Sequence, residues 1–276
     1  MNDSATHRAS IPQSDFTVPD PLEIPSLKGV VSDAEWALRC DLAATYRLCA
    51  LFEMDDHIFT HISVRLPDHN GQRQFLMNPY GVGFEEMTAS SLLVVDEQGE
   101  VVRESPYFSN PAGFTIHSAV HMARDDAHCV LHLHSPYGVA VSAQTEGLLP
   151  CTQFSMVVMD DLAYHDYEGI ATNLEERDRL VADLGEKGFM ILRNHGTLTV
   201  GGNCGIAFLR MYFLDQACKA QILAQAGGAS LIRCDAELTS AVSKQGQPAF
   251  VPGMGDNLAW PAFIRRLKRQ NPGWDY

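Results

Sequence analysis

The chain has 276 residues, of which 46% are hydrophobic and 20% charged, and its formal net charge is -14. This composition is ordinary for a soluble globular protein, and the acidic surface would repel nucleic acid and anionic membranes. No apolar run is long enough to span a bilayer, and the first residues have neither the basic lead nor the apolar core of a secretory signal. We therefore expect a cytoplasmic protein whose partners are neither nucleic acid nor membrane.

The cysteines support the same compartment. There are seven, and no two have the Cys-x-x-Cys spacing. Several lie inside apolar runs, as Cys129 does in HCVLHLH. This usage is typical of buried free thiols in a reducing cytoplasm, and it gives little support to a zinc knuckle or a cysteine nucleophile.

The first half of the chain predicts an arm, a helix and several strands. Residues 1–31 are rich in proline and serine, which favours an extended arm on the surface or on a neighbouring subunit. A helix should begin at Ser32, with Glu35 three residues later as in a capping box. Strands are expected within residues 57–66, 74–78 and 92–96, the last in a hairpin that turns at residues 97–99. A helix should then start near residues 109–111, before the short apolar strand CVLHLHS.

The second half predicts more helices around the same sheet. A helix should start at Ser135, and the amphipathic run LEERDRLVADLGEKG should form a helix closed by Gly188. The run FMILRNHGTLTVG predicts two strands joined by a turn at residues 194–196. A long helix follows, capped by Asn203, and another lies near residues 257–269. Strands in the middle flanked by helices indicate an α/β or α+β sandwich around one sheet.

The H-x-H pattern in CVLHLHS is the sharpest chemical signal. Residues two apart on a strand point to the same face, so His132 and His134 should project side by side while Leu131 and Leu133 enter the core. An apolar setting would keep both imidazoles neutral and ready to bind a metal. Two buried histidines bonded to backbone carbonyls would fit this pattern equally well.

The Asn-His-Gly turn offers a third imidazole, that of His195, at a strand end. From spacing alone an ordinary polar hairpin is the commoner explanation. Three protein nitrogens and an open position are nevertheless the usual composition of a catalytic zinc site.

Two further groups of polar residues are candidates. His117 and His121 lie four apart on a predicted helix and share a face, but no glutamate follows His117 as in H-E-x-x-H. We expect His117 to contact substrate or support the site, and His121 to lie on the surface. The run AYHDYEG, which contains His165, is dense in titratable groups, although a polar loop bonded to its own backbone is the commoner case.

The sequence resembles the class II aldolase/adducin superfamily. The motifs that carry the resemblance are AGFTIHSAVHMARDDAHCVLHLHSPYGVAVSAQTEGLLP, AYHDYEG and ILRNHGTLTVG, and it extends more weakly over residues 32–230. The details are closest to the adducin head domain and its bacterial relatives. Residues 231–276 are then a C-terminal extension.

The resemblance implies a fold, an assembly and a metal. It implies a three-layer α/β/α sandwich around a mainly antiparallel sheet, in a homotetramer whose active sites lie between subunits. The metal would be bound by His132, His134 and His195, with Zn²⁺ as the expected ion and Mn²⁺ or Fe²⁺ as alternatives. The partner would be a small-molecule substrate.

Departures from the sugar-phosphate aldolases change the expected reaction. Pro111, Ala112 and Gly113 stand where those enzymes have Ser-Ser-Glu, so the acid/base glutamate is missing. Thr60 and His61 replace a phosphate-binding Gly-Asn. A buried phosphate without its donors is costly, so we expect a non-phosphorylated hydroxy or keto compound.

The chemistry that the resemblance leaves is aldolase or decarboxylase chemistry through a metal-stabilised enolate. Decarboxylation tolerates the missing glutamate better, because only one proton must be delivered. The residues that could move the proton are His61, His117, Tyr137 and His165, besides metal-bound water. The alternative is a catalytically silent, adducin-like oligomeric scaffold, although we see no long neck or lysine-rich tail of the kind that binds actin or membrane.

Overall fold

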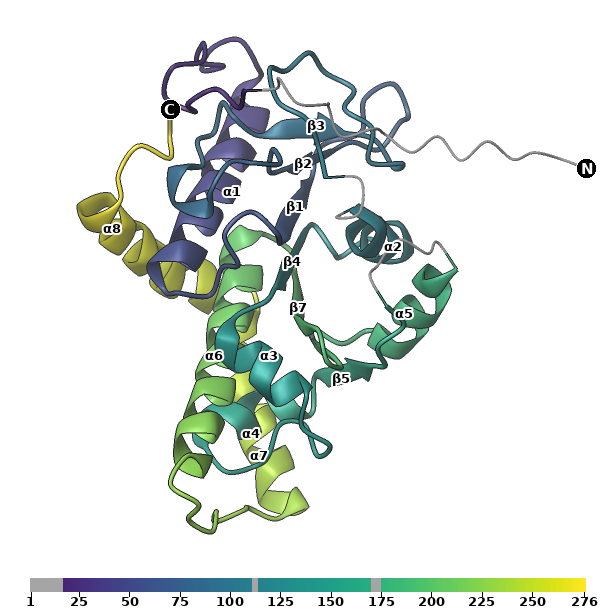
Figure 1. Ribbon diagram of the computed structural model, residues 1–276, viewed down its shortest axis with the longest axis vertical. Coiled ribbons are helices and arrows are strands. Elements are labelled where there is room, and N and C mark those ends of the chain that lie inside the picture. Colours follow the sequence, from purple (N-terminus) through teal and green to yellow (C-terminus); the bar gives the residue numbers. More distant parts are fainter. Residues whose placement is uncertain (1–16, 111–113, 170–174) are drawn as a thin grey trace, which may run out of the picture.

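The computed structural model describes residues 17–110, 114–169 and 175–276. A seven-stranded sheet in the order β3-β2-β1-β4-β7-β6-β5 runs through the molecule between two layers of helices (Figure 1). Every neighbouring pair of strands is antiparallel except β5 with β6, which is parallel. The strands are β1 (His61–Arg65), β2 (Phe75–Met77), β3 (Leu93–Val95), β4 (Cys129–Leu133), β5 (Leu162–His165), β6 (Phe189–Leu192) and β7 (Gly196–Gly201).

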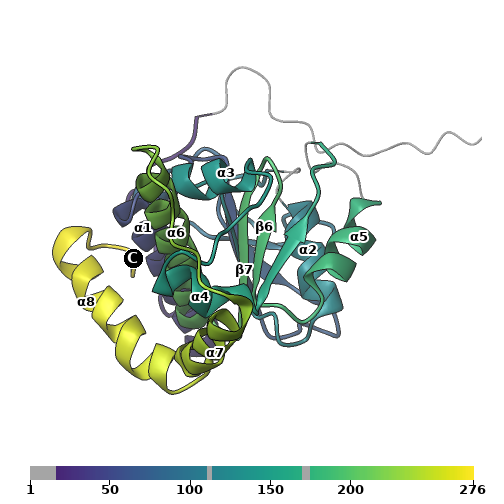
Figure 2. The same ribbon diagram turned by 90° about the horizontal axis from the view of Figure 1, so that it is seen from below.

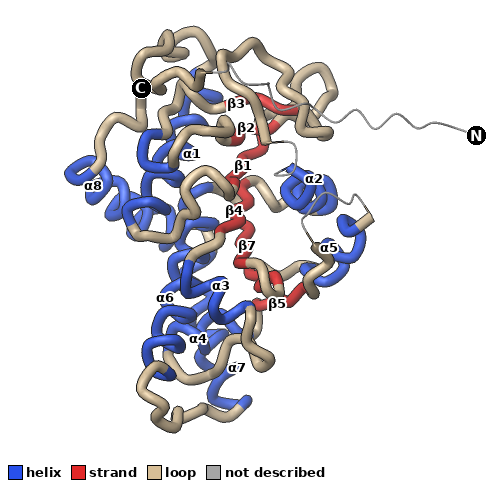
Figure 3. Tube along the Cα trace, in the orientation of Figure 1, coloured by secondary structure: helices blue, strands red, loops and turns tan. Residues whose placement is uncertain are grey.

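The helices divide unequally between the two faces of the sheet. Figure 2 shows α2 (Phe114–Ala123) and α5 (Glu176–Leu184) on one face, and the other helices lie on the opposite side. The second group comprises α1 (Asp33–Leu51), α3 (Pro136–Ser142), α4 (Gln153–Met159), α6 (Cys204–Gln225), α7 (Ala236–Gly246) and α8 (Trp260–Gln270). Figure 3 shows the strands as a column between these layers, so the expected three-layer α/β/α sandwich around a mainly antiparallel sheet is confirmed.

The predicted N-caps are correct for α1 and α6, and the predicted C-terminal glycine is wrong for α5. Ser32 Oγ accepts the N–H of Glu35 and begins α1, although the Glu35 carboxylate pairs with Arg39 instead of completing a capping box. Helix α5 is closed by Gly185, three residues before the predicted Gly188. Gly185 has a φ of +51°, and its N–H bonds to a carbonyl of the last turn, so the helix stops there.

Other local predictions fail where long-range packing decides the structure. The strand expected within residues 57–66 covers only β1, because His57 has a φ of +56° and the chain turns before His61. Leu162–His165 form β5 where a polar loop was the commoner expectation. Helices α4 and α7 and the short 3₁₀ segments Phe84–Glu86 and Gln247–Phe250 were not predicted. The helix expected near residues 257–269 is α8, which follows a π-helix at Gly255–Ala259.

Both described ends of the chain pack on the central domain. Ile24 belongs to the main core cluster, and Tyr107 donates a hydrogen bond to the Pro19 carbonyl at 3.2 Å. At the other end, Leu267 and Trp274 lie in that cluster as well. The domain limits at residues 31 and 230 stay predictions, and residues 1–16 of the expected arm lie outside the described residues.

Two further observations bear on the class of protein. All seven cysteines are free thiols, as expected, and Cys129 is fully buried. Within the described ranges, every helix is too short or too polar to cross a bilayer.

Candidate metal centre

Strand β4 sends its side chains alternately to the two helical layers. Leu131 and Leu133 lie in the core cluster that includes α1 and α6, whereas Val130 belongs to the cluster beneath α2 and α5. His132 has the parity of Val130, so it faces the α2 side, and His134 follows directly after the strand with the same parity. The two imidazole centroids are 4.9 Å apart. The predicted side-by-side arrangement is therefore confirmed.

A tight turn between β6 and β7 positions the third histidine. The His195 N–H donates to the Leu192 carbonyl at 3.1 Å, and Asn194 adopts a φ of +56°, a region that asparagine tolerates. A Cβ on Gly196 would lie 2.5 Å from the Leu133 carbonyl oxygen. Glycine at this position lets β7 approach β4 closely, and this approach brings His195 beside the β4 histidines.

The three imidazoles form a nearly equilateral triangle. The His195 centroid is 4.7 Å from that of His132 and 4.8 Å from that of His134. One ring nitrogen from each residue lies within 4.8 Å of the other two. Such a group of nitrogen donors could hold one metal ion and leave a coordination position open.

Hydrogen bonds fix which nitrogen of the β4 histidines is free. His132 Nδ1 lies 3.1 Å from the Thr197 carbonyl oxygen, and because a carbonyl only accepts, Nδ1 carries the proton. His134 Nδ1 lies 3.0 Å from Asp56 Oδ2 and donates to it. His134 Nε2 is then left buried and without a hydrogen-bond partner among the described residues. Carboxylate and carbonyl acceptors of this kind commonly orient histidines that bind metal.

Burial favours the neutral form of His132 and His195. Desolvation and the neighbouring imidazoles lower the pKa of His132 well below its ordinary value. The same two causes lower the pKa of His195 to about 4. Neutral imidazoles keep the lone pair that a metal needs, so the donor set fits a divalent cation.

Two of the predicted proton-transfer candidates lie beside the triangle. His61 is paired with His132 across β1 and β4, so both side chains project from the same face of the sheet. The His61 ring is 5.9 Å from that of His117, which α2 places over the sheet. Burial lowers the pKa of His61 to about 4, with further contributions from His134 and His195. The structure thus gathers five histidines at one place.

The other two candidates contact different parts of the molecule. Tyr137 packs toward α6, where the ammonium of Lys219 lies 5.2 Å from its ring centroid. His165 lies between two carboxylates of α5, with Nδ1 at 2.7 Å from Asp183 and Nε2 at 3.4 Å from Glu176. These contacts explain both side chains as links between elements, and their predicted catalytic roles stay predictions.

Sequence reasoning missed two residues at the triangle. Asp56, in the loop before β1, binds His134, and the Tyr167 ring lies 6.2 Å from that of His195. Both come from loops whose positions depend on tertiary contacts. The only signal for Tyr167 was its place in the polar run AYHDYEG.

The prediction that His121 lies on the surface is wrong. Its side chain is fully buried, and its ring stacks 4.8 Å from that of Phe75 on β2. The four-residue spacing from His117 already placed both histidines on one face of α2, and that face packs on the sheet. Burial of one histidine should have implied burial of the other.

Comparison with known proteins places the chain in a family. Residues 40–222 match the family described as "Class II Aldolase and Adducin N-terminal domain". The chain belongs to the class II aldolase/adducin family. The predicted resemblance is therefore confirmed.

The relatives of this chain in the class II aldolase/adducin family include proteins named as aldolases and proteins named as adducins. A "putative aldolase class 2 protein" of Caulobacter vibrioides is 55% identical over 90% of this chain and 96% of its own length. Mouse alpha-adducin is 44% identical over 82% of this chain, but the match spans only 31% of alpha-adducin. The similarity to alpha-adducin thus concerns one part of a longer protein.

Solved structures of the family share the fold over most of the chain. An aldolase II superfamily protein from Pseudomonas syringae has a TM-score of 0.85 and 44% identity, covering 91% of this chain and all of the other. L-Fuculose 1-phosphate aldolase from Glaciozyma antarctica has a TM-score of 0.75 and 29% identity, over 91% and 96% of the two chains.

The position at which the resemblance implies a phosphate-binding Gly-Asn lies at the start of β1. Thr60 and His61 are buried there, and Asn78 Nδ2 donates to the Thr60 carbonyl at 3.3 Å. The expected loss of phosphate donors at this position stays a prediction. The positions of the missing Ser-Ser-Glu, Pro111–Gly113, lie outside the described residues.

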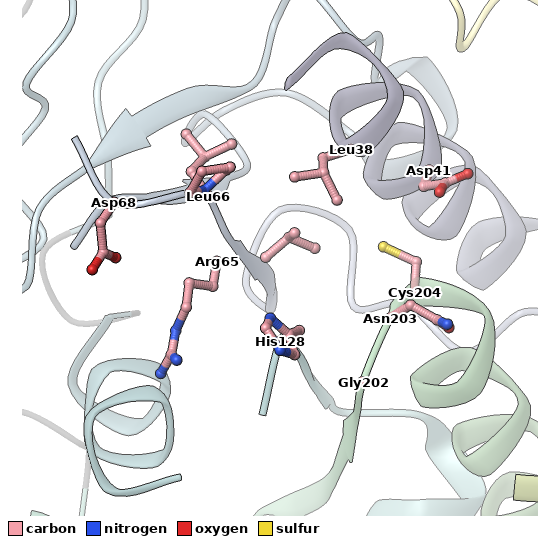
Figure 4. Close-up of a pocket in the computed structure, with 11 residues that line it drawn as sticks. Leu38, Asp41, Arg65, Leu66, Asp68, His128, Gly202, Asn203 and Cys204 are labelled. Carbon is pink, nitrogen blue, oxygen red and sulfur yellow. The ribbon is translucent and has the colours of Figure 1, made fainter. Parts of the chain in front are cut away.

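A separate pocket of about 400 Å³ opens at the opposite end of these strands (Figure 4). Arg65 and His128 border it where β1 ends and β4 begins, and Asn203 and Cys204 border it at the start of α6. Since His132 and His134 lie at the other end of β4, this pocket is distinct from the candidate metal centre.

Proposed function

We propose that this chain is a divalent-metal-dependent lyase acting on a non-phosphorylated hydroxy or keto compound. The observation that carries the proposal is the convergence of His132, His134 and His195, two of them with their Nδ1 protons already committed to acceptors. A scaffold has no need for three converging imidazoles oriented in this way. The family includes proteins named as aldolases, which supports the same reading.

The three histidines would hold the metal, and Asp56 would orient one of them. Three imidazole nitrogens with an open position are the usual composition of a catalytic zinc site, so Zn²⁺ is the expected ion, with Mn²⁺ or Fe²⁺ as the alternatives to test. A bound divalent ion supplies Lewis acidity, which stabilises negative charge that develops on a substrate carbonyl oxygen when a neighbouring carbon–carbon bond breaks.

The surrounding residues set what substrate fits. His61 and His117 flank the triangle as neutral, buried rings, and Asp56 brings a carboxylate. Apart from the metal ion, a phosphate dianion would meet no positive charge from these three residues and would be repelled by the carboxylate. A hydroxyl or carbonyl group is a better match, because neutral imidazoles can donate to it or accept from it.

A substrate screen with matched variants tests the proposal. Hydroxy acids, keto acids and free sugars are incubated with the metal-free, zinc-loaded and manganese-loaded protein, and aldehyde and carbon dioxide release are measured. L-Fuculose is compared directly with L-fuculose 1-phosphate. Metal-dependent release that His132→Ala abolishes and His128→Ala preserves supports the proposal, since His128 lies at the far end of the same strand. Turnover that survives His132→Ala, or occurs only on the phosphorylated sugar, contradicts it.

The similarity to alpha-adducin favours one other function, a catalytically silent oligomer that binds cytoskeletal partners. A homotetramer with its sites between subunits is a shared expectation of both functions, and sedimentation velocity measures it. The two diverge in their dependence on metal. A scaffold should keep its assembly and bind filamentous actin when His132→Ala removes the metal, with no substrate turned over in the screen.

A further inference from the structure

A line of three hydrogen bonds runs from the backbone carbonyl of Ala127 through His121 and Ser63 to His117. His121 Nδ1 lies 2.7 Å from the Ala127 carbonyl oxygen, and His121 Nε2 lies 2.7 Å from Ser63 Oγ. Ser63 Oγ is also 2.7 Å from His117 Nδ1. The side chains of Ser63, His117 and His121 are all buried, so water does not compete for these bonds.

The carbonyl at one end gives the line a direction. A carbonyl oxygen only accepts, so His121 Nδ1 carries a proton. A neutral His121 then has a bare Nε2, which accepts the hydroxyl proton of Ser63. Since the Ser63 hydroxyl has only one proton, its oxygen must accept from His117 Nδ1. A neutral His117 is thereby left with a bare Nε2.

The opposite direction would require a buried charge. If Ser63 donated to His117, His121 would have to donate from both ring nitrogens and become a cation. Burial, with a smaller contribution from the nearby Arg65, lowers the pKa of His121 to about 3. The pKa of His117 is also lowered well below its ordinary value by burial and by His61 and His121. Both rings are therefore neutral near pH 7.

The His117 ring lies beside the candidate metal centre. His117 Nε2 is buried and has no hydrogen-bond partner among the described residues. The His61 ring lies 5.9 Å from the His117 ring, and His61 is paired with His132 across β1 and β4. A bare acceptor nitrogen without a protein partner is costly to bury, which is explained if it meets a ligand proton.

We propose that Ser63 and His121 are positioning residues that hold His117 in its Nδ1–H form, so that Nε2 accepts the proton of a substrate hydroxyl. This role rests on the proposed lyase function. The substrate O–H bond breaks and its proton goes to Nε2, while the oxygen forms a carbonyl as the adjacent carbon–carbon bond breaks. The electron pair of that bond moves to the carbon next to the second carbonyl, which later takes the proton back, so no oxidant or reductant is needed.

The direction of the line also selects among the reactions that the family resemblance left open. Decarboxylation needs a proton donor once carbon dioxide has left, and a bare Nε2 offers none at the start. Cleavage of a hydroxy-carbonyl compound needs an acceptor first, which Nε2 supplies. We therefore expect aldehyde release rather than carbon dioxide release.

Magic-angle-spinning NMR of [¹⁵N]histidine-labelled, zinc-loaded protein tests the protonation pattern without any substrate. The His117 and His121 signals are assigned by their loss in His117→Gln and His121→Gln. We expect protonated Nδ1 and unprotonated Nε2 in both residues. Ser63→Ala should give His117 as a mixture of tautomers, whereas Ser63→Thr, which keeps the hydroxyl, should retain the wild-type pattern. A protonated His117 Nε2 in the wild type would overturn the proposal.

Kinetics on a substrate found in the screen test the role of the line. Ser63→Ala should lower kcat about tenfold and change the acidic limb of the kcat/KM profile, and Ser63→Thr should restore both. Ser118→Ala is the matched control, because Ser118 is a buried serine on α2 whose hydroxyl bonds to the Thr115 carbonyl. Equal losses in Ser63→Ala and Ser118→Ala would reduce Ser63 to a structural residue. Absent turnover with the expected tautomers would instead defeat the lyase function and leave the protonation pattern standing.

Discussion

Replacing Asp56 measures how much the orientation of His134 contributes to metal binding. The carboxylate accepts from His134 Nδ1 at 3.0 Å, and removing such a partner commonly weakens metal affinity by about 10- to 100-fold. Asp56 is 44% exposed, so solvent screens its charge and the lower end of that range applies. We expect Asp56→Ala to raise the zinc Kd about tenfold, which corresponds to about 1.4 kcal/mol. Asp56→Asn keeps a neutral acceptor and should fall between.

Competition with a chromophoric chelator measures these affinities, and elemental analysis checks that the stoichiometry is unchanged. Asp68→Asn is the matched control, since Asp68 is an exposed carboxylate beside the pocket at the far end of the sheet. An Asp56→Ala protein that binds zinc as tightly as the wild type would refute the reasoning. So would an equal loss in Asp68→Asn, because the effect would then come from overall charge.

Three other changes test the surroundings of the site. Gly196→Ala should push β7 away from β4, since its Cβ would lie 2.5 Å from a backbone oxygen. It should therefore weaken zinc binding and lower Tm. In the control Gly202→Ala the added Cβ meets nothing within 4 Å, and neither quantity should change. His132→Ala should bind no stoichiometric zinc, and calorimetry should show that it loses the stabilisation of about 2.7 kcal/mol that a ligand gives at 100 times its Kd. Burial lowers the pKa of His121 to about 3 in the folded protein, so on acidification the unfolded chain binds a proton at this residue first. The free energy of unfolding should therefore fall as pH drops below about 6.5. Urea titrations of His121→Gln should show a smaller fall over the same pH range.

The local part of the site could be predicted from sequence, because strand geometry is local. The two-residue period of β4 places His132 and His134 on one face whatever the rest of the chain does. The position of His195 beside them depends on how β7 pairs with β4, and the family resemblance supplied that information. Asp56 was missed because it approaches His134 from a loop 78 residues earlier in the chain.

In the fold, too, the elements with strong local signals could be predicted, and those that depend on packing could not. Long periodic segments such as α1 and α6 have caps at Ser32 and Asn203 that a reader can find in the sequence. Helix α4 has only seven residues, and its packing against α6 and α7 rather than its own periodicity explains why it forms. His121 was misplaced for the related reason that burial is a property of the neighbouring layer.

His132 lies on β4, His134 follows β4 directly, and His195 directly precedes β7. Strands β4 and β7 are paired with each other from Cys129 to Leu133. The cage is thus a rigid part of the sheet, assembled before an ion arrives, and the apo-protein should fold without one. Metal binding would then not be coupled to folding, as it is in a zinc finger, so folding would contribute little to the selection of one cation over another. The ion that the three histidines bind in a cell would then depend on which metals the cell supplies. The same protein could therefore hold different metals in different growth media.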